Sequence, residues 1–113
     1  MLEKLAQLER THAELTQRLA DPALLADRKA YAETNRALSE IGHVVALYRD
    51  YSAARRQLAE NQELLAGLAK DDELFALAQE EREQLGQRIA RLEEELRREL
   101  VPLVLLAPPG ARR

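Results

Sequence analysis

The sequence predicts an all-α fold, an elongated antiparallel helical bundle or coiled coil with three main helices. A helix-compatible stretch runs from about residue 27 to residue 69 without a proline, and leucine stripes at spacings of three and four precede and follow it. Ala, Glu, Leu, Arg and Gln dominate the composition, which is typical of long helices. The expected main helices are 2–20, 27–69 and 72–100, with one short helical turn at 22–26.

The first helix, 2–20, is expected to carry its apolar side chains on one face. The residues that share this face are Leu2, Leu5, Leu8, His12, Leu15 and Leu19. Asp21 and Pro22 should end the helix, because a proline disfavours helical geometry in the residue before it and lacks an amide donor. The same pair can begin the short turn at 22–26, and Asp27 then offers an N-cap for the central helix.

The central helix, 27–69, would be about 60 Å long, so it needs partners that cover its apolar side. Its expected stripe consists of Tyr31, Leu38, Ile41, Val45, Tyr48, Leu58, Leu65 and Leu68, with Val44 and Tyr51 at the edge. Arg55 and Gln62 also occupy stripe positions, so the stripe becomes more polar toward its end. Gly42 costs about 1 kcal/mol relative to alanine. This leaves two alternatives, a closely packed partner at Gly42 or a bend in the helix.

The segment from Gly67 to Asp72 predicts a helix end, a loop and a new N-cap, and therefore a reversal of the chain. The expected stripe of the last helix, 72–100, is Leu74, Leu77, Ala78, Glu81, Leu85, Ile89, Leu92, Leu96 and Leu100. Pro102 is expected to end this helix. We therefore expect one helical domain over residues 1–102, followed by an irregular tail over 103–113 that is apolar and rich in proline and arginine.

Composition argues against several function classes. The net charge is −3, with 20 acidic and 17 basic residues mixed along the chain, which disfavours a basic face for nucleic acid. The chain has no cysteine, so it forms no disulfide and no thiolate metal site. The first ten residues lack the apolar core of a signal peptide, and the apolar run at 100–107 is too short to cross a bilayer. We expect a cytoplasmic protein that has no membrane partner.

Residues that commonly carry chemistry are sparse. His12 and His43 have no cysteine, second histidine or carboxylate pair at the spacing of metal ligands, and no glycine-rich loop follows a strand. The paired acids at 80–81 and 93–95 face different directions on a helix, which indicates a solvated surface. We therefore expect no catalytic residue, no cofactor and no metal ion, and we expect that the chain is not an enzyme.

Several segments, taken in order, resemble a known family. They are Met1-Leu2-Glu3-Lys4-Leu5, Leu19-Ala20-Asp21-Pro22 followed by Asp27 and Tyr31, Ile41-Gly42-His43-Val44-Val45 to Tyr48-Arg49-Asp50-Tyr51, Asp72-Glu73-Leu74, Leu77-Ala78-Gln79-Glu80-Glu81 and Leu100-Val101-Pro102. Together they resemble the amino-terminal domain of bacterial class I peptide chain release factors, more closely the type that reads UAA and UAG. The resemblance implies a part in translation termination, with contacts to large-subunit stalk-base proteins of the ribosome and to a GTPase release factor.

The resemblance ends near residue 102 and does not reach the family's two working motifs. These are a Gly-Gly-Gln loop for peptidyl-tRNA hydrolysis and a Pro-x-Thr tripeptide for codon reading. No two glycines are adjacent here, and no threonine lies two residues after a proline. We therefore expect an accessory domain without hydrolysis or codon reading. The abrupt change of composition at Leu103 leads to the hypothesis of a gene truncated or frameshifted at that point.

Two other function classes stay open. One is a generic helical interaction module that self-associates through its leucine stripes, since a narrow core favours oligomers. The other is a tRNA-binding helical arm like that of seryl-tRNA synthetase. Such an arm needs a basic face, and the mixed charges of this sequence argue against one.

Overall fold

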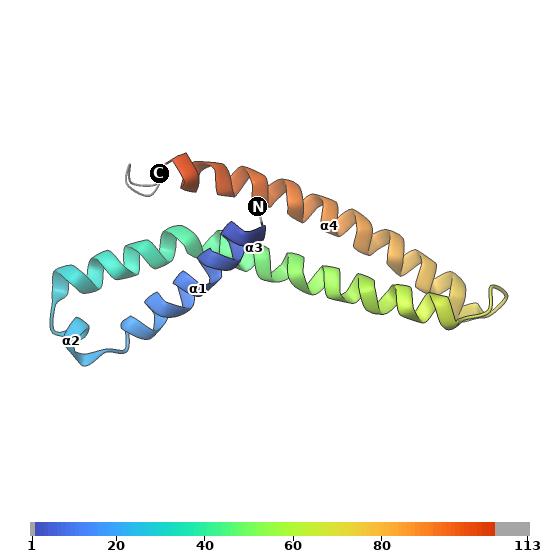
Figure 1. Ribbon diagram of the computed structural model, residues 1–113, viewed down its shortest axis with the longest axis horizontal. Helices are drawn as coiled ribbons and strands as arrows, with labels where there is room; N and C mark the ends of the chain where they lie inside the picture. Colours follow the sequence, from blue (N-terminus) through green and yellow to red (C-terminus); the bar gives the residue numbers. More distant parts are fainter. Residues whose placement is uncertain (1, 106–113) are drawn as a thin grey trace. The chain divides into compact units, whose positions relative to one another are not determined.

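The computed structural model describes residues 2–105, and all regular secondary structure in that range is helical (Figure 1). The helices are α1 (Leu2–Arg18), α2 (Pro22–Leu25), α3 (Arg28–Gly67) and α4 (Glu73–Leu105). The all-α class is confirmed, as are the three main helices and the short one between the first two. Residues 106–113, most of the expected tail, lie outside the described residues, and the domain boundary at residue 102 stays a prediction.

Three aspartates begin the helices that follow them, as the sequence predicts. The Oδ1 atom of Asp21 accepts a hydrogen bond from the amide two residues later at 3.0 Å, and Pro22 follows as the first helical residue. The Oδ1 atom of Asp27 accepts from the amide three residues later at 3.1 Å. The Oδ1 atom of Asp72 accepts from the amide two residues later at 2.9 Å. Each carboxylate thus satisfies an amide that the helix itself leaves without a partner.

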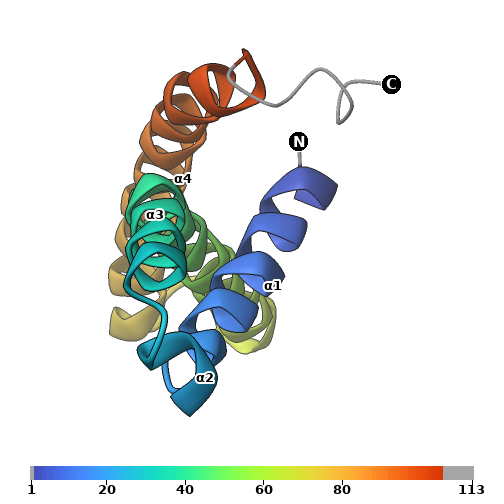
Figure 2. The same ribbon diagram turned by 90° about the vertical axis from the view of Figure 1, so that its left-hand side faces the viewer.

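The chain divides into two compact units, and α3 runs through both of them. The first unit contains α1, α2 and α3 as far as Ala46, together with residues 102–105. In this unit α2 forms the corner between α1 and α3 (Figure 2). The second unit, Leu47–Val101, contains the rest of α3 and most of α4.

The first unit buries the apolar face of α1 as expected, apart from the first turn. Leu5 is buried, and four further residues of the face are half-buried, namely Leu8, His12, Leu15 and Leu19. Leu2 was also expected on this face, but its side chain is 48% exposed because it lies in the first turn of the helix. On α3, Val44 and Val45 are both buried, and Tyr31 is half-buried.

The second unit is an antiparallel helical hairpin, in which the loop at 68–72 joins α3 to α4 (Figure 1). Most of its least exposed side chains recur at spacings of three and four, the repeat of a coiled coil, with one gap of seven on α4 at the exposed Arg82. On the α3 side they are Leu47, Tyr51, Ala54, Leu58, Asn61, Leu65 and Leu68. On α4 they are Phe75, Ala78, Leu85, Ile89, Leu92 and Leu96. We call these two series the seam.

The expected stripe of α3 is partly wrong in the second unit. Tyr48, expected at its centre, is half-buried, whereas Tyr51, expected at the edge, is 3% exposed. Arg55 and Gln62 were expected on the stripe and are exposed, and Asn61 is buried in their place. The misplaced positions 48, 55 and 62 each follow a seam position, 47, 54 or 61, by one residue. The expected stripe thus had the correct repeat but was one residue out of register at these positions, because the register depends on which positions the partner helix covers.

The expected stripe of α4 also needs correction at both of its ends. Leu74 and Leu77 are 55% and 63% exposed, and the nearby seam positions belong to Phe75 and Ala78. The expected helix end at Pro102 is wrong as well, because α4 continues to Leu105, which makes the backbone at 103–105 helical rather than irregular. A proline removes one helical hydrogen bond and disfavours the preceding residue's helical geometry without forbidding it. The other predicted helix ends lie within two residues of the observed ones.

Gly42 does not mark a site of close packing. A Cβ atom built on it would meet no atom within 4 Å outside the backbone of its own helix and its two chain neighbours. The first of the two alternatives raised for this residue is therefore wrong. Gly86 in α4 has the same open surroundings and is exposed.

We expect Gly86→Ala to raise the free energy of unfolding by about 1 kcal/mol, because alanine loses less backbone entropy in a helix and its methyl group meets no neighbour. Urea denaturation followed by far-UV circular dichroism measures the change. Ala90→Gly is the matched control, since Ala90 is exposed on the same helix and should show the opposite sign. A Gly86→Ala chain no more stable than the natural one would contradict the prediction.

Candidate functional site

The two histidines of the chain lie on different helices. Within residues 2–105 no group of three or more His, Asp or Glu side chains could hold a metal ion. His12 is half-buried on α1, and His43 is exposed on α3. A surface groove of about 400 Å³ is lined by Glu81, Gln84, Leu85, Gln87, Arg88 and Arg91. All six residues belong to α4, and the surface of a single helix does not enclose a small ligand.

Tyr51 forms a polar cluster that ties α3 to α4 inside the second unit. Its hydroxyl donates a hydrogen bond to Glu93 Oε1 at 3.1 Å and accepts one from Arg55 Nη1 at 2.8 Å. The guanidinium carbon of Arg55 lies 5.7 Å from the centroid of the Tyr51 ring, a cation–π distance. The hydrogen bond from Arg55 to Tyr51 raises the pKa of the guanidinium, and the nearby Glu93 carboxylate adds to the effect.

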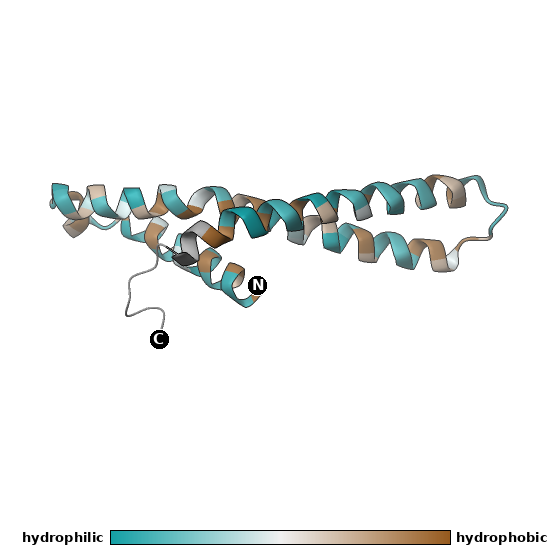
Figure 3. Ribbon diagram, turned by 90° about the horizontal axis from the view of Figure 1, so that it is seen from above, coloured by the Kyte–Doolittle hydropathy of each residue, from teal (hydrophilic) through white to brown (hydrophobic). Residues whose placement is uncertain are grey.

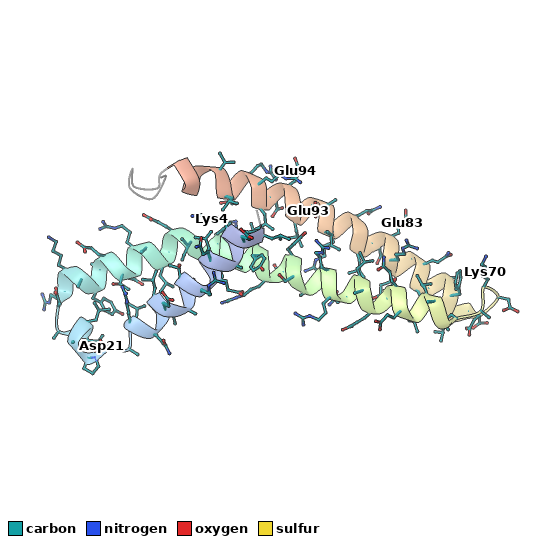
Figure 4. All side chains as sticks on the ribbon, in the orientation of Figure 1. Lys4, Asp21, Lys70, Glu83, Glu93 and Glu94 are labelled. Atoms are coloured by element: carbon teal, nitrogen blue, oxygen red, sulfur yellow. The ribbon has the colours of Figure 1, made fainter. Side chains whose placement is uncertain are left out.

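The arrangement of this cluster indicates a structural role. The phenol of Tyr51 uses its hydroxyl both as donor and as acceptor, and the side chain is buried, so no substrate can reach it. Glu93 lies on the side of α4 that faces α3 (Figure 4). The cluster therefore fixes how the two helices pair. Sequence reasoning placed Tyr51 at the edge of a stripe, and the alternating spacing from Leu47 was the signal that it belongs to the seam.

Asn61 is the one buried polar residue among the described side chains. It lies in the seam between Leu58 and Leu65, and its Nδ2 atom donates a hydrogen bond to the carbonyl oxygen of Ala78 at 2.9 Å. Its Oδ1 atom is buried without a hydrogen-bond partner. A buried asparagine in a coiled coil fixes the register of the helices at a cost in stability. Asn61 was not among the residues expected on the stripe of the central helix.

The loop end of the hairpin, residues 60–81, carries the most distinctive surface, and we call it the hairpin tip. It contains seven carboxylates and a single basic residue, Lys70, a net charge of −6 in a chain whose total is −3. The remainder of the chain therefore carries +3. The even mixing of charges inferred from the sequence holds for the whole chain but not for this segment.

Three leucines at the hairpin tip are exposed, and Figure 3 shows apolar residues on both helices next to the loop. Leu64 is 49% exposed, Leu74 55% and Leu77 63%. We call these residues the leucine triplet. Lys70 lies in the loop that joins the two helices (Figure 4).

Comparison with known proteins assigns the chain to a family. Residues 8–104 match the PCRF domain. The chain belongs to the PCRF domain family. The matched range begins within α1 and ends one residue before the end of α4, so it includes most of the first unit, the whole second unit and the hairpin tip. The resemblance inferred from the helix breaks and tyrosines is thereby confirmed.

Individual relatives of this PCRF domain chain are proteins named peptide chain release factor 1. The protein of Thermus thermophilus is 40% identical over 102 residues, which are 90% of this chain and 28% of the relative. That of Magnetococcus marinus is 38% identical over 100 residues, 88% of this chain and 28% of the relative. The protein of Syntrophomonas wolfei is 37% identical over 102 residues, which are 90% of this chain and 28% of the relative.

The chain thus spans a little over a quarter of the length of these relatives. No solved structure matches the chain significantly. Within residues 2–105, no helix combines the length and the apolar sequence that a membrane span requires.

Proposed function

We propose that the chain is an accessory domain of translation termination that contacts the ribosome and carries neither peptidyl-tRNA hydrolysis nor codon reading of its own. The match of residues 8–104 to the PCRF domain carries this proposal. The sequence supports the second half, because it contains no Gly-Gly-Gln and no Pro-x-Thr motif. The described side chains support it too, since they form a helical scaffold in which Tyr51 and Asn61 are buried in structural hydrogen bonds.

The proposed partners follow from the family resemblance. They are proteins at the stalk base of the large ribosomal subunit and a GTPase release factor, and the proposed place of action is the cytoplasm, where ribosomes translate. Helical hairpins suit this task, because a rigid coiled coil can present a surface at a fixed distance from the rest of a protein.

The charge distribution bears on the two other function classes. A tRNA-binding arm requires basic residues along the hairpin to neutralise phosphates, whereas the hairpin tip carries a net charge of −6. Self-association through two copies of the tip would bring like charges together. Both observations favour a protein partner of opposite charge over RNA or a second copy.

Co-sedimentation of the purified chain with ribosomes tests the proposal. We expect the chain to pellet with ribosomes at low salt, to be released by increasing salt, and to be displaced by a full-length release factor 1, because both would occupy the same position. In a peptide-release reaction on ribosomes that hold a stop codon, the chain alone should release no peptide above background.

Two outcomes would contradict the proposal. A chain that stays in the supernatant at low salt does not contact the ribosome on its own. Peptide release above background would show a hydrolytic function that an accessory domain lacks. A full-length release factor 1 serves as the positive control, both in the co-sedimentation and in the peptide-release reaction.

A further inference from the structure

We propose that the hairpin tip is a docking surface for a basic protein, with the leucine triplet as its apolar centre and the surrounding carboxylates as its charged rim. This inference rests on the proposed function and makes it more specific, since it selects protein rather than RNA among the components of the ribosome. It names the residues that make the contact.

The pairing of the two helices brings the leucine triplet to one level of the hairpin. The hydrogen bond from Asn61 to the Ala78 carbonyl fixes which parts of α3 and α4 are opposite each other. Leu64 lies three residues beyond Asn61 toward the loop, and Leu77 lies one residue before Ala78. The three leucines therefore lie within about one helical turn of each other along the hairpin axis.

The seam also determines on which side of the hairpin the leucines lie. Leu64 directly precedes the seam residue Leu65, and Leu74 directly precedes the seam residue Phe75, so both occupy the same type of flanking position. In an antiparallel coiled coil, flanking positions of the same type lie on the same side of the pair. Leu77 is three residues after Leu74 and shares its helical face. The leucine triplet thus forms one patch rather than scattered side chains.

Charged residues surround this patch, and seven of the eight in the hairpin tip are acidic. Glu60 precedes Leu64 by four residues and Glu81 follows Leu77 by four, so each shares a helical face with its leucine. Asp71 lies in the loop and is exposed, as are Glu60 and Glu81. An exposed apolar patch with a charged rim is the usual form of a protein interaction site.

The sign of the rim selects the class of partner. Nucleic acids and membrane surfaces with anionic lipids are both negatively charged and would be repelled by a net charge of −6. A second copy of the tip carries the same charge. A protein with an apolar depression among lysines and arginines complements both the leucine triplet and its rim.

Binding measurements on the full chain test this inference. The chain has no cysteine, so Ala20→Cys, in the exposed turn after α1, accepts a single fluorophore far along the sequence from the tip. Fluorescence anisotropy is then measured against purified basic proteins of the large ribosomal subunit, each alone, against protein-free ribosomal RNA, and against unlabelled chain. Circular dichroism checks that every variant is folded.

We expect at least one basic protein to bind, and Leu74→Gln/Leu77→Gln to weaken that binding by about tenfold or more. The matched control is Leu2→Gln/Leu25→Gln, which changes two leucines of similar exposure outside the tip and should alter the affinity by less than about twofold. Asp71→Lys/Glu81→Lys should also weaken binding by about tenfold, and the exposed pair Glu14→Lys/Glu33→Lys should not.

Three outcomes would overturn the inference. In the first, the chain binds ribosomal RNA or unlabelled chain, and Leu74→Gln/Leu77→Gln weakens that binding. In the second, a basic protein binds the natural and the variant tips equally, and in the third, none of the basic proteins binds the natural chain. Co-sedimentation separates this failure from that of the proposed function. If the natural chain and the tip variant pellet equally with ribosomes, only the docking surface is wrong. If the natural chain does not pellet, the proposed function fails as well.

Discussion

Leu96→Ala is expected to lower the free energy of unfolding by about 3 kcal/mol, within the range of about 2 to 5 kcal/mol for buried leucines that leave a cavity. The side chain of Leu96 is fully buried in the seam of α4. The hairpin has a narrow core, with Ala54 and Ala78 at other buried positions, so few neighbours can move in to fill the space. Urea denaturation followed by far-UV circular dichroism measures the loss.

Leu77→Ala provides the matched control for this prediction. It makes the same chemical change on the same helix at a residue that is 63% exposed, so its effect should stay within about 0.5 kcal/mol. Losses of about 3 kcal/mol for both variants would mean that the seam assigned to α4 is wrong. Losses within about 0.5 kcal/mol for both would mean that the hairpin contributes little to the measured stability.

Asn61→Asp is expected to destabilise the protein by about 3 kcal/mol at neutral pH, because it places a carboxylate in the seam. The carboxylate would lose the hydrogen bond that Asn61 Nδ2 now donates and would face the Ala78 carbonyl oxygen at close range. The natural residue already leaves one oxygen without a partner, so the site offers no donor that could stabilise a negative charge. Denaturation curves at neutral pH measure the effect.

The destabilisation by Asn61→Asp should depend on pH in a direction that burial determines. Burial raises the pKa of the new carboxyl above the value of about 3.9 in the unfolded chain. The folded protein then binds the proton more tightly than the unfolded chain does. The variant therefore regains stability as the pH falls toward the carboxyl pKa of the unfolded chain, and it loses stability as the pH rises through the carboxyl pKa of the folded protein. Asn35→Asp, exposed on α3, is the matched control and should show little loss at any pH. A pH-independent loss at Asn61 would contradict a buried carboxylate.

The helix boundaries were predictable because their signals are local. Asp21, Asp27 and Asp72 each act on an amide two or three residues away, so the sequence around them contains the whole cause. The apolar face of α1 was also predictable, since its leucines at spacings of three and four have only alanines as apolar competitors on the other faces. The family resemblance rested on the order of these breaks together with the tyrosines near residue 50.

The seam of the hairpin was harder to predict, because it depends on which positions the partner helix covers. A spacing that starts at Leu47 makes Tyr51 central, whereas a seven-residue repeat that starts at Ile41 makes Tyr48 central, and the pairing with α4 decides for Tyr51. Asn61 has no feature that distinguishes it from Gln62 in the sequence. Likewise Leu74 and Leu77 fit an apolar stripe as well as Phe75 and Ala78 do, until the geometry of the pair exposes the two leucines.

The hydrogen bonds across the hairpin have a consequence for the order in which it folds. Asn61 and Ala78 are 17 residues apart in sequence, whereas Tyr51 and Glu93 are 42 apart. The entropic cost of closing the loop between Asn61 and Ala78 is lower by about 0.8 kcal/mol than the cost of closing the loop between Tyr51 and Glu93. We therefore expect the two helices to meet first beside the loop and to pair progressively toward Tyr51, so that the asparagine sets the alignment before most of the leucines have found their partners.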